Sequence, residues 1–228
     1  MPGPRRVLLS SCLLLAAGGT AAAQNQPADP APVGLSIGLR AGYGIPGGNV
    51  GSLSDGGEQL SLSDGVKGMV PFWLDLAYKI TPHLGVGASL QYGFGLVNKE
   101  KSMCTDCTVE DIAFSANLYL HAVPGGKFDP WAGIGLGYEI LGITNRSPEG
   151  EAKVKLEGFQ YLVLQAGGDL ATGTAISVGP FFSVSVGRYD TVNTTARLGG
   201  RSISQSEDIP KPSWHQWVTL GVQGRFNL

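Results

Sequence analysis

The stretch Val33-Gly-Leu-Ser-Ile-Gly-Leu-Arg-Ala-Gly-Tyr43 decides the fold class. Its odd-numbered positions hold Val, Leu, Ile, Leu, Ala and Tyr, whereas Gly, Ser, Gly, Arg and Gly occupy the even-numbered positions between them. A period of two residues places alternate side chains on opposite faces of an extended strand. The stretch is therefore predicted to be a β-strand with one apolar face and one small or polar face.

The same alternation returns seven more times and predicts eight strands in all. They lie near 33–44, 69–80, 84–97, 111–123, 131–141, 158–170, 175–188 and 213–228. Helices are disfavoured because 35 of the 228 residues are glycine, and each glycine in a helix costs about 1 kcal/mol relative to alanine. The hydrophobic content of 43% also argues against a disordered chain. The chain is therefore predicted to be all-β.

The two faces of the predicted strands differ in chemistry. One face is apolar, and in the second strand it consists of Phe72, Leu74, Leu76, Tyr78 and Ile80. The other face carries mostly Gly, Ser, Asn and Gln, with three charges of each sign: Arg40, Asp75, Lys79, Glu139, Asp169 and Arg225. Balanced charges suit a confined interior in which they pair; the alternative is an open face on which they are solvated. We expect the six to form an ionic network inside a barrel.

The connections between the predicted strands alternate in length. Those at 81–83, 124–130 and 171–174 are short, and those at 45–68, 98–110, 142–157 and 189–212 are long and polar. This asymmetry is typical of an outer-membrane barrel with periplasmic turns and extracellular loops. The predicted fold is thus an eight-stranded antiparallel up-and-down transmembrane β-barrel. Because a closed barrel has no edge strand to host a proline, a bulge or kink is expected at Pro180, unless the sheet is open there.

Aromatic residues are expected to form girdles at the two membrane interfaces. Those near the long connections are Tyr43, Phe72, Tyr92, Phe94, Phe114, Tyr138 and Trp214, and those near the short turns are Tyr78, Phe128, Trp131 and Phe226. Their alternative role is ordinary core packing.

The first 23 residues are predicted to be a cleaved signal peptide. Arg5 and Arg6 form its basic region, Val7–Ala17 its apolar region and Ala21–Ala23 its cleavage site. A lipobox at Cys12 and a twin-arginine signal are the alternatives.

The remainder of the chain is predicted to be exported. Residues 24–32 are interpreted as a short Pro-rich periplasmic leader and residues 33–228 as the barrel. No apolar run of 18 residues remains after residue 23 to form a spanning helix. The predicted location is the cell outer membrane.

The alternation, the Gly-rich inner face and the closing stretch Trp217-Val-Thr-Leu-Gly-Val-Gln-Gly-Arg-Phe-Asn-Leu228 resemble the small eight-stranded outer-membrane β-barrels, the OmpA/OmpX-like superfamily. The resemblance implies that Phe226 and Leu228 form the signal read by the barrel-assembly machinery, although the family usually ends on an aromatic residue. It also implies periplasmic chaperones during biogenesis, outer-membrane lipid as the surroundings and a monomer. No further domain is expected after the last strand.

Two constellations are candidates for chemistry. Cys104 and Cys107 lie in a long connection in an oxidising compartment, where a disulfide is favoured over a zinc site or a redox pair, because no second Cys or His pair is nearby. His215 faces inward near the extracellular rim, and Asp190, Asp208 and Ser213 are expected close to it. No spacing fixes a catalytic site there. We therefore predict no catalytic residue, metal or cofactor.

Three functions remain open from the sequence. The first is a structural or surface-interaction protein whose interior is plugged by its own side chains. The second is a narrow pore or carrier for small solutes, and the third is a hydrolase or acyltransferase at the rim. A nucleic-acid partner is not expected at a net charge of −2.

Overall fold

The computed structural model describes residues 33–52, 59–99, 101, 106–148, 150–173, 175–199 and 201–228. The predicted signal peptide and leader lie outside these residues. The described elements are β1 (Gly34–Ser52), β2 (Leu60–Ser61), α1 (Leu62–Gly65), β3 (Val66–Lys79), β4 (Leu84–Val97), β5 (Cys107–His121), β6 (Phe128–Ser147), β7 (Gly150–Ala171), β8 (Ile176–Leu198), β9 (Arg201–Asp208), β10 (Lys211–Pro212) and β11 (Trp214–Asn227). In this part of the chain, no helix has the length and apolarity to cross a membrane.

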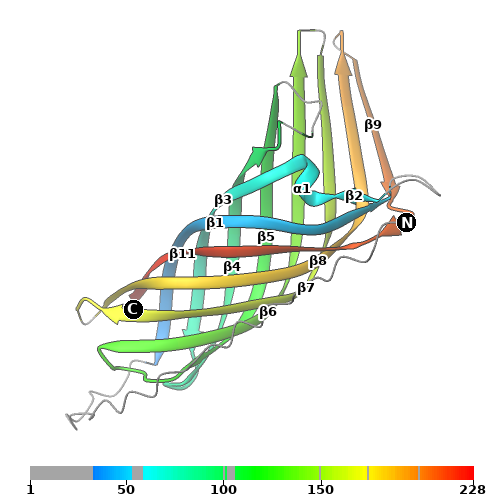
Figure 1. Cartoon of the computed structure of the whole chain (residues 1–228). Helices are drawn as coiled ribbons and strands as arrows, with labels where there is room; N and C mark the ends of the chain where they lie inside the picture. Colours follow the sequence, from blue (N-terminus) through cyan, green and yellow to red (C-terminus); the bar gives the residue numbers. More distant parts are fainter. Residues whose placement is uncertain are drawn as a thin grey trace, which may run out of the picture.

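Eight of the strands close into a ring. Each pairs antiparallel with its neighbours in the order β1, β3, β4, β5, β6, β7, β8 and β11, and β11 pairs with β1 again (Figure 1). We can trace the paired residues from strand to strand around the ring, starting at Gly34 of β1. The trace returns to β1 at Gly44, ten residues further along the strand. Such a stagger tilts the strands against the barrel axis. The predicted eight-stranded antiparallel barrel is confirmed.

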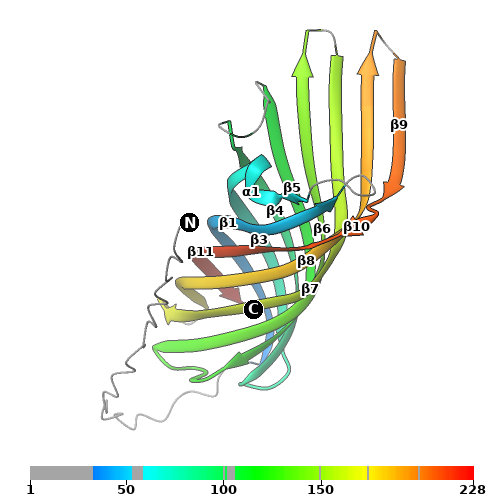
Figure 2. The same ribbon diagram turned by 45° about the vertical axis from the view of Figure 1, so that its right-hand side comes forward.

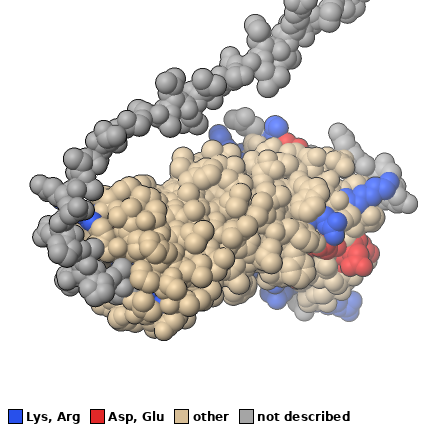
Figure 3. All heavy atoms as spheres, turned by 90° about the horizontal axis from the view of Figure 1, so that it is seen from below, with Lys and Arg blue, Asp and Glu red and all other residues tan. Residues whose placement is uncertain are grey.

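Apolar side chains cover the outside of the ring, and polar side chains lie within it. Leu39, Leu136 and Leu220 are 65%, 64% and 64% exposed, whereas Arg40 and Glu139 are 5% and 1% exposed. In Figure 3 the charged residues gather towards the right-hand end of the molecule, and most of the visible surface between the ends carries neither sign. An apolar outer band around a polar interior is the arrangement of a barrel that meets lipid.

Three of the ring strands, β6, β7 and β8, continue beyond the ring, and β9 pairs with β8 there. The pairing of β6 with β7 reaches Ser147 and Gly150, and that of β8 with β9 reaches Leu198 and Arg201. β6, β7, β8 and β9 therefore project together as a sheet, here called the extension (Figures 1 and 2). At the turn between β8 and β9, Gly199 has a φ of +55°, a conformation that glycine adopts without steric cost.

The extension corrects the expectation of long polar loops at 142–157 and 189–212, because paired strands cover most of these segments. The outward positions of these segments are polar, as at Lys153 and Lys155, whereas Leu141 and Leu156 face inward and are buried. A strand in water above the membrane needs no apolar outer face. Such a strand lacks the alternation of apolar and polar residues that marks a lipid-facing strand. In the sequence it therefore looks like a polar loop.

A small apolar cluster lies at the end of the ring from which the extension projects. Leu62 of α1 and Val66 of β3 are 2% and 1% exposed and pack with Leu141, Tyr189 and Trp217. The α1 segment is also tied to the connection after β4 by hydrogen bonds. The Asn98 side-chain amide donates to the Ser63 carbonyl oxygen at 2.8 Å, and the Lys101 ammonium contacts the Asp64 carboxylate at 2.8 Å.

Pro180 does not open the sheet. It pairs with Val222 of β11 in an unbroken register. On the β7 side the pairing stops at Gly167 with Phe181 and resumes at Leu170 with Val178 in the same register. Of the bulge or kink expected at Pro180, the register shows no bulge, and the β7–β8 ladder is interrupted locally beside the proline.

Bulges occur at another level of the barrel. The β7–β8 register shifts between Glu157 and Gly158 and again between Gln160 and Leu162, and the β6–β7 register shifts between Gly135 and Gly137. The two β7–β8 shifts lie near Arg188, where β11 stops pairing with β8, and the β6–β7 shift lies lower in the ring, beside Asn117 and Ser115 of β5. A bulge bends its strand and increases its local twist, which explains why β7 and β8 change direction where the extension begins (Figure 2).

Inward glycines make room for large side chains, as their position on the small face predicts. A Cβ atom at Gly133 would lie 2.9 Å from the Tyr119 ring, and one at Gly167 would lie 2.6 Å from the Trp131 ring. Trp131 is itself 4% exposed and points into the barrel. Its assignment to the girdle near the short turns was therefore wrong, because its parity within β6 places it on the inner face.

Candidate functional site

Three layers of polar side chains fill the inside of the ring. We call them the turn-side layer, the middle layer and the outer layer, in order from the short turns towards the extension. The six predicted interior charges are distributed among these layers, and each layer has its own hydrogen-bond network.

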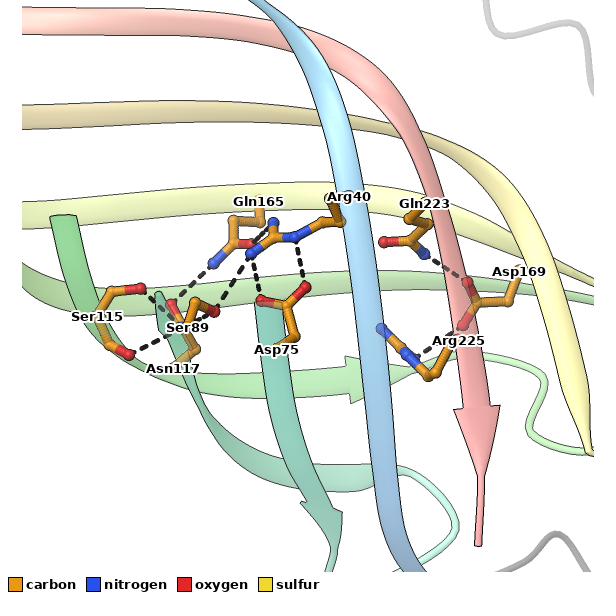
Figure 4. Close-up of polar contacts among 9 residues, drawn as sticks. All are labelled: Arg40, Asp75, Ser89, Ser115, Asn117, Gln165, Asp169, Gln223 and Arg225. Atoms are coloured by element: carbon orange, nitrogen blue, oxygen red, sulfur yellow. Dashed lines mark hydrogen bonds and ion pairs between the residues drawn. The ribbon is translucent and has the colours of Figure 1, made fainter. Parts of the chain in front are cut away.

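The middle layer is built around Arg40. Its guanidinium donates to both carboxylate oxygens of Asp75 at 2.7 Å and to the side-chain oxygen of Gln165 at 2.5 Å (Figure 4). The Gln165 amide donates to Asn117 at 2.8 Å, and Asn117 donates to Ser89 at 3.0 Å. These partners come from five different strands, so the network crosses the full width of the barrel.

Aromatic rings hold the guanidinium in place. Its central carbon lies 5.0 Å from the centroid of Trp73 and 5.2 Å from that of Phe181, and the two rings meet edge to face at 5.4 Å. Cation–π contacts strengthen when water is excluded. The Arg40 charge is therefore compensated by a carboxylate and by ring faces together.

The turn-side layer contains Arg225 and Asp169. Arg225 donates to Asp169 at 2.8 Å, and Gln223 donates to the other oxygen of the same carboxylate at 2.5 Å (Figure 4). His121 lies beside this pair, with its Nε2 3.4 Å from Arg225 and its Nδ1 2.7 Å from Asp129.

Lys79 belongs to the turn-side layer as well. It is 9% exposed and lies within electrostatic reach of Arg225, Asp129 and Asp169. Asp129 was missed by sequence reasoning, because it falls in a segment predicted as a turn. The β6 strand begins at Phe128, three residues before the predicted start at 131. Continuing the alternation back from Trp131 by two residues places Asp129 on the inner face.

The outer layer is centred on Glu139. Its carboxylate accepts hydrogen bonds from the Tyr189 hydroxyl, from the Trp217 indole at 2.9 Å and from the Gln160 amide at 2.7 Å, and His215 Nε2 lies 3.3 Å away. Tyr189 stacks on His215 with ring centroids 3.9 Å apart. Glu139 therefore has no direct link to the other predicted charges, and these neutral donors compensate for its burial.

Asp111 is a second buried carboxyl group in the outer layer. It is 0% exposed and accepts a hydrogen bond of 2.5 Å from Gln91, while its Oδ1 has no partner among the described residues. Asp111 stands two positions before Ala113 on the inner face of β5. Strand parity alone would therefore have identified it.

Little space remains between the middle and outer layers. The cavity there measures about 20 Å³ and is lined by side chains of both layers, including Arg40, Gln165, Gln160 and Trp217. A volume of this size accommodates about one water molecule.

His215 and the acidic residues considered with it as candidates for rim catalysis are not assembled into a site. His215 is 1% exposed, beneath the apolar cluster, and contacts Glu139. Asp190 pairs instead with Arg188 at 2.8 Å, and Asp208 is exposed at the end of β9. A buried imidazole without access to solvent is poorly placed to act on a substrate.

The remaining predicted positions lie outside the network. Cys107 is disulfide-bonded; Cys104 lies outside the described residues, so their pairing stays a prediction. Phe226 and Leu228 are 44% and 62% exposed on the lipid-facing side, and their role in assembly also stays a prediction. On the surface beyond the ring, the hydrogen bond and charge of Asp64 raise the pKa of Lys101 above its ordinary value.

Comparison with solved structures finds the same fold. The structure is similar to Neisserial surface protein A over 88% of this chain and 100% of that chain, with a TM-score of 0.50 and 10% identity. It is also similar to a major outer membrane protein from Thermus thermophilus over 84% of this chain and 99% of that chain, with a TM-score of 0.50 and 14% identity. No protein-family model and no curated protein matches the sequence.

The ring of eight strands, its apolar outer band and these likenesses define the class: the chain has the fold of the small outer-membrane β-barrels. This is the fold of the superfamily that the sequence resembles, and the outer membrane is the location that the sequence predicts.

Proposed function

We propose that the protein is a non-conducting outer-membrane barrel with a structural or surface-interaction role. In this proposal the barrel anchors the chain in lipid, and the extension presents the surface that other molecules meet. The single observation that carries it is the 20 Å³ cavity, the space left between two hydrogen-bonded layers. A solute path would need a continuous opening through all three layers.

The extension supports a role outside the barrel. β6, β7 and β8 continue well past the ring, β9 pairs with β8 there, and all residues of β9 are exposed. Strands longer than the membrane requires add no lipid-facing surface. A sheet that stands in solvent is therefore best explained by contacts made there.

Enzymatic activity forms no part of the proposal, because His215 lies buried beneath the apolar cluster. The partners that we propose are outer-membrane lipid in the mature state and, during biogenesis, periplasmic chaperones and the barrel-assembly machinery. The protein is proposed to act as a monomer, without nucleic acid.

Conductance in planar lipid bilayers tests the proposal. We expect wild-type protein to give no steady current, because the Arg40–Asp75 pair and the turn-side layer obstruct the lumen. Combining Asp75→Ala with Lys79→Ala should produce openings, since both residues belong to these layers. The matched control combines Asp64→Ala with Lys101→Ala at the exposed pair and should stay closed.

A steady current through wild-type protein would overturn the proposal and support a narrow pore. In each preparation, a mobility shift on heating before SDS gel electrophoresis would show that the barrel is folded. Protein that stays monomeric in detergent-free buffer would contradict membrane insertion itself.

A further inference from the structure

The outward face of the sheet changes chemistry in three steps. An apolar groove lies over the ring, lined by residues of β3 to β7. A row of aromatic rings on β6, β7 and β11 borders it, and a polar groove with two lysines lies beyond this row on β7, β8 and β9 of the extension. The three surfaces are continuous because β7 lines both grooves and carries Phe159 and Tyr161 of the aromatic row between them.

The apolar groove has a volume of about 750 Å³. Its floor is formed where the outward residues are small, at Ala88 and Ala116, and taller side chains such as Leu76, Leu90 and Leu136 surround it. Ala88 and Ala116 are paired neighbours on β4 and β5. The groove therefore offers an apolar channel suited to flexible hydrocarbon chains.

Aromatic rings border this groove on the side of the extension. Tyr138 and Phe159 meet edge to face at 5.2 Å, Phe159 and Tyr161 lie 6.3 Å apart, and Tyr161 meets Trp214 at 5.3 Å. Tyr138, Phe159 and Tyr161 also line the groove itself. Tyrosine and tryptophan favour the boundary between hydrocarbon and headgroups, so this row marks the membrane interface.

The polar groove on the extension has a volume of about 260 Å³. Lys153 and Lys155 line it together with the hydroxyls of Thr195 and Ser204 and the amide of Asn193. Lysine and hydroxyl groups are hydrogen-bond donors, which suits an anionic oxygen ligand.

The two lysines are the uncompensated charges of this face. No described carboxylate forms an ion pair with Lys153 or Lys155, whereas Arg146 and Arg188 are paired with Glu151 and Asp190 at 3.1 Å and 2.8 Å. The acidic residue of the groove, Glu157, accepts hydrogen bonds from Tyr138 and Asn193.

Lys153 also leans towards the membrane. Its Cε lies 3.9 Å from the position of a Cβ at Gly142, the residue that pairs with Lys155. Phe159 and Lys155 are four residues apart on β7, which is about 13 Å at the rise of an extended strand. A headgroup with its acyl chains in the apolar groove would therefore have its phosphate within reach of the lysines.

We propose that this face is a binding site for one multiply acylated lipid with a phosphate-bearing headgroup. Its acyl chains occupy the groove over Ala88 and Ala116, and its phosphate is bound by Lys153 and Lys155. The charge complementarity of two unpaired lysines above an apolar groove selects such a lipid over a zwitterionic one. The proposal requires membrane insertion but is independent of whether the barrel conducts.

Native mass spectrometry of the full protein with diphosphoryl lipid A tests the site. We expect one retained lipid per barrel, and about thirtyfold weaker retention when Lys153→Gln is combined with Lys155→Gln, because each basic residue near a membrane surface contributes about 1 kcal/mol. The matched control combines Lys67→Gln with Lys99→Gln, which removes the same charge from exposed positions. Its retention should equal that of wild type.

The acyl part is tested separately. Ala116→Trp should fill the groove and weaken retention, whereas Ala132→Trp, an exposed outward position nearer the short turns, should not. Wild-type protein should retain dephosphorylated lipid A as weakly as the Lys153→Gln, Lys155→Gln variant retains the diphosphoryl form. The proposal would be overturned if the Lys67→Gln, Lys99→Gln control lost as much lipid as that variant. It would also be overturned if wild-type protein retained both forms of lipid A equally. Complete displacement by millimolar inorganic phosphate would identify a free-anion site and would also overturn it.

Discussion

Arg40 and Asp75 form a bidentate ion pair inside the barrel, with two hydrogen bonds of 2.7 Å between residues 35 positions apart in the chain. Asp75 stands opposite Gly38, not opposite Arg40. A Cβ at Gly38 would lie 3.2 Å from the Asp75 side chain. The missing side chain at position 38 therefore gives Asp75 the space in which it reaches Arg40.

Breaking this pair should destabilise the barrel strongly. Asp75→Asn leaves the Arg40 charge buried without a counter-charge, which we expect to cost about 3–5 kcal/mol of unfolding free energy. The measurement is equilibrium unfolding by urea in lipid vesicles. Replacing both residues, with Arg40→Met and Asp75→Leu, should cost less than Asp75→Asn alone. A larger loss in the double variant would show that the pair is a net source of stability.

The outer layer should depend on the number of donors around Glu139. Tyr189→Phe removes one hydrogen bond to a buried carboxylate and should cost about 1.5–3 kcal/mol. Glu139→Gln should cost more, because an amide group then faces several donors. The same urea titration measures both variants, and Tyr161→Phe on the lipid side serves as the unchanged control. If Tyr189→Phe were neutral, the hydroxyl would not support the layer.

Inward and outward glycines should respond oppositely to alanine. A methyl group at Gly167 would lie 2.6 Å from the Trp131 ring and 2.8 Å from the Pro180 carbonyl oxygen, whereas nothing lies within 4 Å of the same atom at Gly224. Gly167→Ala should therefore lower stability by about 1–3 kcal/mol. Gly224→Ala should be neutral, or should stabilise the barrel by about 0.4–1 kcal/mol because alanine lowers the conformational entropy of the unfolded chain. The fraction of each variant that unfolds, measured by the gel mobility shift over a series of temperatures, gives the unfolding midpoint. Equal midpoints for the two variants would contradict the tight packing inferred at Gly167.

The disulfide of Cys107 should protect a connection and leave the barrel unchanged. Cys107 begins β5 beyond the ring, so Cys107→Ser should speed proteolytic cleavage between β4 and β5. The unfolding midpoint of the ring should stay the same. Thiol titration of the unfolded protein, with and without reductant, then tests whether Cys104 is the partner. Two free thiols in the unreduced mature chain would exclude that pairing.

Phe226 should matter for assembly more than for stability. Phe226→Ala in the last strand should reduce the amount of folded barrel in cells, if the assembly machinery reads this residue. Phe114→Ala removes another outward aromatic side chain, and this variant should assemble normally. Phe114 is 51% exposed, and Phe226 is 44% exposed. Both purified variants should refold alike in detergent. Equal cellular yields would remove Phe226 from the assembly signal.

Much of the barrel interior could be predicted from strand parity. Arg40, Asp75 and Glu139 were placed on the inner face because alternation assigns every second residue to one side. Asp129 and Asp111 obey the same parity. They were missed only because they lie at predicted strand ends, where boundaries are set by pairing with distant strands.

The extension illustrates the limit of such reasoning. Its outward face is polar because it stands beyond the lipid, so Lys153 and Lys155 look like loop residues in the sequence. Only their pairing with Thr195 and Asn193 of β8 shows that they belong to a sheet. The apolar and polar grooves depend on this pairing, and no local pattern indicates them.

The sequence by itself determined which side chains face inward, because the period of a strand is a local property of the backbone. The tertiary structure decided which inward side chains meet. Closure of the ring with its ten-residue stagger brings Gln165 to Arg40 across 125 positions of sequence, and it places Glu139 in a layer of its own with Tyr189 and Trp217. Contacts of this kind depend on the register of all eight strands together, and no single strand specifies that register.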